Sequence, residues 1–259
     1  MKFIKKMKAF YSKCLSLKKL LKTIRPYTIK DEKRHAKDAD LDFEGVVLMD
    51  TFDYKDSKEE LANAITHGIG LLLSIPALVF LILFAIEKGT AWHIVSFSIF
   101  GASMLILFLF STLLHSVKEG KLKKLFAILD HSAVYLLIAG TYTPFMLVSL
   151  RDPLGWTIFG IVWGLAAAGI VFKCYFVDRY QIIATLFYIL MGWLIMIAIV
   201  PLYHELTAAG FALLFAGGLF YSVGAIFYVW RKLPYNHAIW HLFVIAGSAF
   251  MYFCVLLYV

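Results

Sequence analysis

The stretch "ITHGIGLLLSIPALVFLILFAI", residues 65–86, decides the class of fold. It contains no Asp, Glu, Lys or Arg, and it is long enough to cross the hydrocarbon core of a bilayer, which takes a helix of about 20 apolar residues. A chain that crosses hydrocarbon must pair its backbone groups internally, and a helix does this within one segment. The stretch therefore predicts a transmembrane helix.

Apolar stretches of similar length recur through the rest of the chain. Together with the first they lie at about 65–86, 92–114, 126–149, 153–172, 181–202, 207–230 and 238–259. The whole chain of 259 residues is 61% hydrophobic and 16% charged, with a mean hydropathy of +0.79, which is more apolar surface than a soluble domain of this size can bury. We expect an all-α, multi-pass integral protein of the cell membrane, built as a bundle of seven transmembrane helices.

The short connections between these stretches differ in charge on the two sides of the bundle. One set of connections holds two basic residues, Lys88 and Arg151. The other set holds eight: Lys118, Lys121, Lys123, Lys124, Lys173, Arg179, Arg231 and Lys232. By the positive-inside rule the lysine-rich connections and the N-terminus are cytoplasmic, and the C-terminus at Val259 is outside.

Residues 1–57 differ in character from the seven-helix domain predicted over 58–259. The first 60 residues hold 15 of the 25 basic and 11 of the 17 acidic side chains. In "MKFIKKMKAFYSKCLSLKKLLKTI" apolar residues recur at intervals of three and four between lysines, which predicts a basic amphipathic helix over about 2–24 on an anionic leaflet. A solvated basic arm is the alternative. The acidic residues that follow predict a flexible cytoplasmic linker.

Four ionisable side chains are expected at one level of the bundle. His115 ends the second stretch in "FSTLLHS", Asp130 begins the third in "LDHSAVYLLIAGTYTP", and His237 and His241 begin the seventh in "NHAIWHLFVIAGS". With seven spans, these three helix ends fall on the same membrane face in either orientation. Asp130 is placed inside a span, where an ionisable group is costly and is normally paired or functional.

Three histidines and one carboxylate in this arrangement are typical of a zinc site. His237 and His241 project to one side of a helix because they are four residues apart, and His115 would supply a third nitrogen. Three protein ligands and an open position are typical of catalytic zinc, and Asp130 could receive or orient the proton of a water bound to the ion. Ser111, one turn before His115, could donate a hydrogen bond to the substrate or the water. Alternatively, histidines at helix ends cap carbonyls or lie among headgroups.

Two further histidines are expected at the same face. His131 follows Asp130 directly and is therefore turned about 100 degrees away around the helix, so both cannot easily reach one ion. His67 lies at the start of the first span. We interpret both as neighbours of the metal ligands or as packing residues, and the sequence leaves their roles open.

Four segments in order, "EELANAITHGIG", "FSTLLHS", "LDHSAVYLLIAGTYTPF" and "NHAIWHLFVIAGS", resemble the signature segments of the hemolysin III family. This family is the bacterial branch of the progestin and adipoQ receptor family, within a wider group of seven-span hydrolases that includes alkaline ceramidases. The resemblance covers residues from about Lys58 to the C-terminus. Leu114 and Met251 depart from it, because relatives often have tyrosine and histidine there.

The resemblance implies a seven-helix bundle with a cytoplasmic N-terminus and a zinc ion near the cytoplasmic face. By motif, the zinc ligands fall on His115, His237 and His241. The aspartate that holds the zinc-bound water falls on Asp130, and the serine of S-x-x-x-H falls on Ser111.

Three functions remain open at this point. The first is a zinc-dependent hydrolase of lipid-like amides or esters, similar to a ceramidase. The second is a non-enzymatic receptor or integrity factor in which zinc is structural, and the third is a pore-forming, cytolytic protein. Membrane lipids are the expected substrate or ligand. No nucleic-acid module, glycine-rich phosphate loop or serine hydrolase elbow is found, so we expect no nucleic-acid partner.

Overall fold

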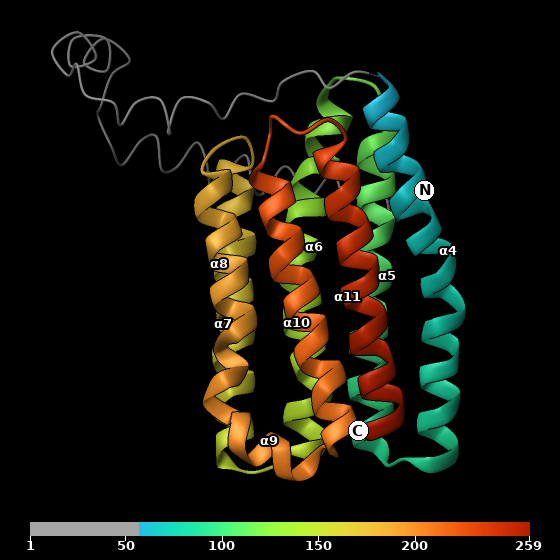
Figure 1. The fold of residues 1–259 in the computed structure, drawn as a ribbon, viewed down its shortest axis with the longest axis vertical. Helices are drawn as coiled ribbons and strands as arrows, with labels where there is room; N and C mark the ends of the chain where they lie inside the picture. The colour runs from blue at the N-terminus through green and yellow to red at the C-terminus, as the bar shows by residue number, and fades with distance from the viewer. Residues whose placement is uncertain (1–56) are drawn as a thin grey trace, which may run out of the picture.

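The computed structural model describes residues 57–259, and it is an all-α bundle. Seven helical spans in this range are long and apolar enough to cross a membrane, and they run side by side, alternately up and down (Figure 1). The prediction of a seven-helix, multi-pass membrane protein is confirmed. Apart from Ser57, the predicted N-terminal extension lies outside the described residues.

The spans follow one another along the chain with short connections. They are formed by α4 (Ser57–Lys88), α5 (Ala91–Ser116), α6 (Lys121–Pro144) with the π-helix η1 (Phe145–Ser149), α7 (Pro153–Phe176), α8 (Gln181–Trp193) with the 3₁₀-helix η2 (Leu194–Ala198) and α9 (Ile199–Glu205), α10 (Ala208–Val229), and α11 (Asn236–Tyr258). The helices α4 and α5, α5 and α6, α10 and α11, and α11 and α4 pack against each other.

The third span, α6 with η1, lies at the centre of the bundle. In its most apolar window 72% of the residues are buried, compared with 22% for the first span, α4. The apolar side chains of α4 face outward instead, and Leu72 is 69% exposed. An apolar exterior is what a bundle surrounded by lipid requires, because lipid tails rather than water cover it.

Some charged residues expected in connections lie inside helices. Lys173 is in the last turn of α7 and is fully buried, and Lys123 is in the first turn of α6 and is also buried. Glu60 lies in the first turn of α4, before the predicted start of that span. The predicted spans stop at these residues because they are charged. The helices continue past them, which is possible when a charged side chain has a polar partner.

The fifth span is broken, although the sequence predicts one continuous helix over 181–202. The 3₁₀-helix η2 interrupts it at Leu194–Ala198. The Tyr142 hydroxyl of α6 donates hydrogen bonds to the carbonyl oxygens of Met191 (3.0 Å) and Gly192 (2.7 Å). These carbonyls precede the change of helix type, and in a membrane a loosened backbone group needs such a partner.

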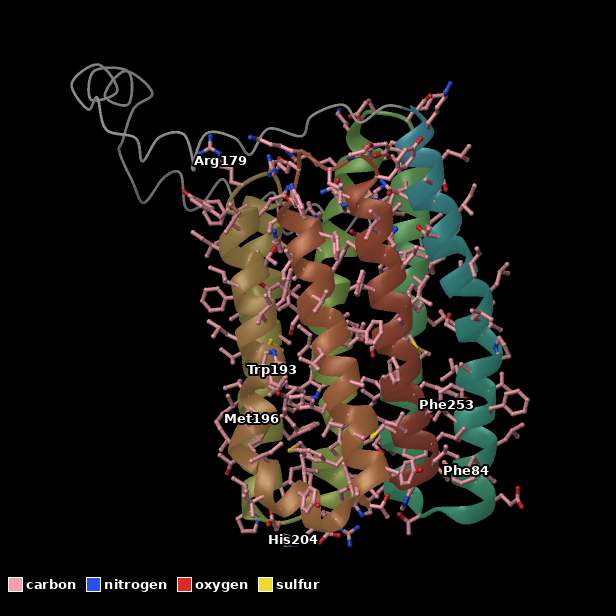
Figure 2. All side chains as sticks on the ribbon, in the orientation of Figure 1. Phe84, Arg179, Trp193, Met196, His204 and Phe253 are labelled. Carbon is pink, nitrogen blue, oxygen red and sulfur yellow. The ribbon has the colours of Figure 1, made fainter. Side chains whose placement is uncertain are left out.

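The two ends of the bundle are marked by Arg179 and His204, which lie at opposite ends in Figure 2. Because the spans alternate, the end of α5 and the starts of α4, α6 and α11 lie at the Arg179 end. We call this the polar end, defined by the residues Glu60, His67, His115, Lys123, Asp130, His237 and His241. Its assignment to the cytoplasmic side stays a prediction.

Candidate metal centre

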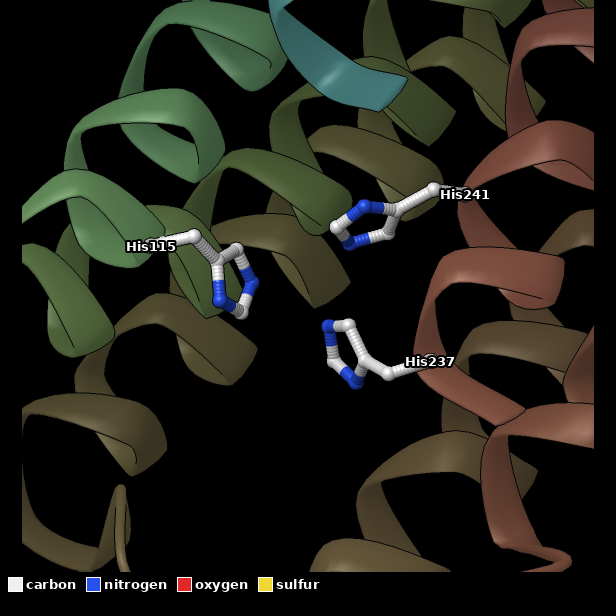
Figure 3. A group of neighbouring side chains, drawn as sticks. All are labelled: His115, His237 and His241. Atoms are coloured by element: carbon white, nitrogen blue, oxygen red, sulfur yellow. The ribbon is translucent and has the colours of Figure 1, made fainter. Parts of the chain in front are cut away.

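Three histidines from two helices converge at the polar end. His115 is in the last turn of α5, and His237 and His241 are in the first two turns of α11. Each offers a ring nitrogen that lies within 4.8 Å of the other two. In Figure 3 His237 and His241 project from one helix and His115 faces them from α5.

The donor set fits zinc. Imidazole nitrogens bind zinc at about 2.0–2.1 Å, which places two ligand nitrogens of a tetrahedral site roughly 3.4 Å apart. The observed separations are within 4.8 Å, so small rotations of the side chains would close the set. His115 Nε2 is buried and has no hydrogen-bond partner among the described residues, as expected of an atom that a metal ion would bind. That these residues bind zinc stays a prediction.

The proton positions on two of the rings follow from their partners. His115 Nδ1 lies 3.2 Å from Glu60 Oε2, and His241 Nδ1 lies 3.2 Å from the carbonyl oxygen of Asn63. Carboxylate and carbonyl oxygens accept hydrogen bonds, so each Nδ1 carries the proton and donates it. In the neutral form of each ring, the lone pair is therefore on Nε2.

Asp130 and Ser111 lie beside the cluster but do not belong to it. Both are buried, and both line the same cavity as His237 and His241. Asp130 is within electrostatic range of His115 and of the buried Lys173. A cation is the natural partner of a buried carboxylate. The sequence predicts Lys173 in a connection because its charge follows an apolar stretch, whereas the structure places it inside α7. Ser111 Oγ is buried and faces the Asp130 carboxylate.

The cavity beside the cluster has a volume of about 150 Å³ and is mainly apolar. It extends from the histidines between α6, α8, α10 and α11, and its lining includes Met196 and Phe215. These two side chains are 46% and 41% exposed on the outer surface of the bundle. The cavity therefore reaches the lipid-facing surface near η2 and α10. Met251, one of the two departures from the family pattern, also lines it.

Two more histidines, His67 and His131, also line the cavity. The His67 ring stacks on the His241 ring, with 3.4 Å between ring centroids and 12° between ring planes. His131 Nδ1 donates to the carbonyl oxygen of Ala127 at 2.7 Å, and the Tyr188 hydroxyl donates to the His131 carbonyl oxygen at 2.9 Å. Neither histidine belongs to the group of three.

Sequence reasoning missed the contribution of α4. Glu60, Asn63 and Thr66 contact the histidine cluster through the bonds to His115 and His241. The segment "EELANAITHGIG" contains the signal, because these residues are spaced by three and so share one face of a helix. Their partners lie on other helices, far along the chain, and the sequence alone does not pair them.

The bundle and the histidine cluster define this molecule as a multi-pass membrane protein with a candidate metal centre at one end. Residues 55–252 match the family described as "Haemolysin-III related", and the chain belongs to this family.

Two bacterial relatives are similar over most of their length. The chain is 65% identical to "Hemolysin-3" of Bacillus cereus over 202 residues, which cover 78% of this chain and 92% of that protein. It is 63% identical to the "Hemolysin-3 homolog" of Bacillus subtilis (strain 168) over 201 residues, or 78% of this chain and 94% of the relative.

A more distant relative is human. The chain is 29% identical to "Monocyte to macrophage differentiation factor" of Homo sapiens over 203 residues, which cover 76% of this chain and 83% of the relative. This similarity supports the relationship to the progestin and adipoQ receptor family that the sequence motifs indicate.

Proposed function

We propose that this protein is a zinc-dependent membrane hydrolase that acts on lipid-like amides or esters. The observation that carries the proposal is the convergence of His115, His237 and His241 beside an apolar cavity that also contains a carboxylate. A zinc ion held by these histidines would polarise a substrate carbonyl and lower the pKa of a water molecule to about 7. Three histidines, rather than four protein ligands, favour a catalytic over a structural ion.

Asp130 would serve as the general base. Its carboxylate lines the cavity beside the histidines, where it can accept the proton that an attacking water loses and pass it to the leaving group. The buried Lys173 lies within its electrostatic range and supplies the positive charge that an ionised carboxylate inside a membrane needs.

Ser111 and the cavity wall would position the substrate. The Ser111 hydroxyl is buried and lines the cavity beside Asp130, so it can hydrogen-bond a substrate oxygen. The apolar lining suits an acyl chain, and the exposed positions of Met196 and Phe215 provide access from the bilayer. The proposed substrate class is therefore a lipid whose amide or ester lies near the polar end.

Hydrolysis by the purified protein tests this proposal. Wild type loaded with zinc in nanodiscs is incubated with lipid amides and lipid esters, and the released fatty acid is measured by mass spectrometry. We expect release that a zinc chelator abolishes and that added zinc restores. Release of no fatty acid from either substrate class by the zinc-loaded protein would contradict the proposal.

Cytolysis is a second candidate, and the name of the 65% identical relative, "Hemolysin-3", favours it. A pore does not need a metal centre, so the two candidates respond differently to loss of the histidines. Dye leakage from liposomes is compared for wild type and the His115→Ala, His237→Ala, His241→Ala triple variant. Equal leakage from both would favour a pore, whereas no leakage from either would favour the hydrolase.

A further inference from the structure

The helix α4 contributes no residue to the histidine cluster, but its first turns contact two of the three histidines. Glu60, Asn63 and Thr66 follow one another at intervals of three and share one face of α4. Glu60 contacts His115 of α5, and the other two residues contact His241 of α11. This face of α4 therefore packs directly against the histidine cluster.

The contact to His115 leaves one nitrogen of the ring for a metal. His115 Nδ1 donates to Glu60 Oε2 at 3.2 Å, while Nε2 is buried without a partner in the described residues. A ring held in this way has its lone pair on Nε2 and cannot rotate freely. A carboxylate that accepts from one ring nitrogen typically strengthens a histidine as a metal ligand through the other nitrogen.

The contacts to His241 also leave Nε2 of that ring for a metal, but here the acceptors are neutral oxygens. The Thr66 hydroxyl donates to the carbonyl oxygens of Ala62 (2.9 Å) and Asn63 (3.0 Å). Its oxygen therefore accepts from His241 Nδ1, at 3.0 Å. The Asn63 carbonyl oxygen is a second acceptor for the same nitrogen, at 3.2 Å, so this ring also presents Nε2 to the cluster.

Glu60 is itself held in place. Lys123 Nζ, from the first turn of α6, donates to the same carboxylate oxygen at 2.8 Å. The Lys123 side chain is 11% exposed and that of Glu60 is 22% exposed, so water competes little for this ion pair. Lys123 also lies 3.7 Å from Glu119, whose side chain is 65% exposed and which has no contact to a histidine of the cluster.

We propose that α4 is the positioning element of the metal centre: Glu60 fixes the tautomer and orientation of His115, and Thr66 with the Asn63 carbonyl fixes those of His241. This inference rests on the zinc binding in the proposed function, but not on hydrolysis. Partners of this kind typically raise metal affinity by about 10- to 100-fold.

Zinc affinity tests the inference without an assay of activity. The dissociation constant is measured in nanodiscs by competition with a chelating dye for wild type, Glu60→Ala and Glu119→Ala. Both variants remove a carboxylate near Lys123, but only Glu60→Ala removes the acceptor of His115. We expect Glu60→Ala to bind zinc about 10- to 100-fold more weakly and Glu119→Ala to match wild type.

Two further variants separate positioning from general stability. Glu60→Gln retains an acceptor oxygen without the charge, so it should restore part of the lost affinity. Thr66→Val removes one of two acceptors of His241, so its loss should be smaller than that of Glu60→Ala, and it provides the test if Glu60→Ala does not fold. The visible spectrum of bound Co²⁺ should change in Glu60→Ala and Thr66→Val but not in Glu119→Ala.

The outcomes distinguish this inference from the proposed function. If wild type binds zinc and both Glu60→Ala and Thr66→Val bind it equally tightly, the positioning role is wrong and the metal centre stands. If folded wild type binds no zinc, the metal centre and the positioning role are both wrong.

Discussion

Histidines lie at both ends of this bundle, and their hydrogen bonds differ. At the end away from the cluster, His93 Nδ1 accepts from the backbone N–H of Thr90 at 3.1 Å, within a capping box at the start of α5. Its Nε2 lies 3.2 Å from a Val259 oxygen. At the polar end, His115 uses Nδ1 for Glu60, and its Nε2 has no partner within residues 57–259.

The difference separates histidines that stabilise helix ends from histidines that can bind a ligand. Both ring nitrogens of His93 have partners, so a metal ion would have to replace a hydrogen bond there. The partner of His115 lies on another helix and occupies only the nitrogen that faces away from the cluster. The number and direction of the ring's partners, rather than its position at a helix end, therefore indicate function.

Asp130 gives the largest expected effect on turnover. Asp130→Asn retains the shape of the side chain but cannot accept a proton, so the rate of hydrolysis should fall by about 10²- to 10⁴-fold while the zinc content is unchanged. Initial rates and elemental mass spectrometry of the same samples measure both quantities. Asp152→Asn, at the opposite end of the bundle, is the control and should retain turnover. Full activity of Asp130→Asn would exclude it as the base.

Two buried serines of α5 allow a smaller effect to be measured. Ser111 lines the cavity, whereas Ser96 lies near the other end and donates to the Trp92 carbonyl oxygen at 2.7 Å. Loss of one hydrogen bond is worth about 1 kcal/mol, so Ser111→Ala should lower kcat by up to about tenfold and Ser96→Ala should leave it unchanged. Steady-state kinetics would refute the role of Ser111 if both variants behaved alike.

The smallest effect is expected for His93→Ala. Loss of the capping interaction should cost about 1 kcal/mol, which lowers Tm by about 2–4 °C for a domain of this size. Thermal unfolding in nanodiscs measures this change. The zinc content should equal that of wild type, and a loss of zinc would mean that the two kinds of histidine are not distinct.

The fold could be predicted from the sequence because lipid imposes a simple requirement. Each apolar stretch must be long enough to cross the bilayer and must form its backbone hydrogen bonds within itself. The seven spans can therefore be identified from the sequence without knowledge of how the helices pack. The break at Leu194–Ala198 was not predicted, because it depends on the Tyr142 hydroxyl, which reaches α8 from another helix. Hydropathy does not report such a contact.

The site could be predicted only in its outline. The i, i+4 spacing of His237 and His241 and the alternation of the spans indicate that these residues and His115 lie at one level. The contacts of Glu60 with His115 and Lys123 join residues 55 and 63 positions apart, so they depend on how α4, α5 and α6 pack. The local pattern places Glu60 on one face of a helix with Asn63 and Thr66, but it does not pair Glu60 with residues of other helices.

The zinc content of the purified protein tests the central claim most directly. Wild type and the His237→Ala, His241→Ala double variant are prepared in nanodiscs without added metal and compared by elemental mass spectrometry, with circular dichroism to verify that both are folded. We predict about one zinc ion per chain in wild type and almost none in the double variant, as expected when two of three ligands are lost. Little zinc in folded wild type, or equal zinc in both proteins, would contradict the assignment of a metal centre to these histidines.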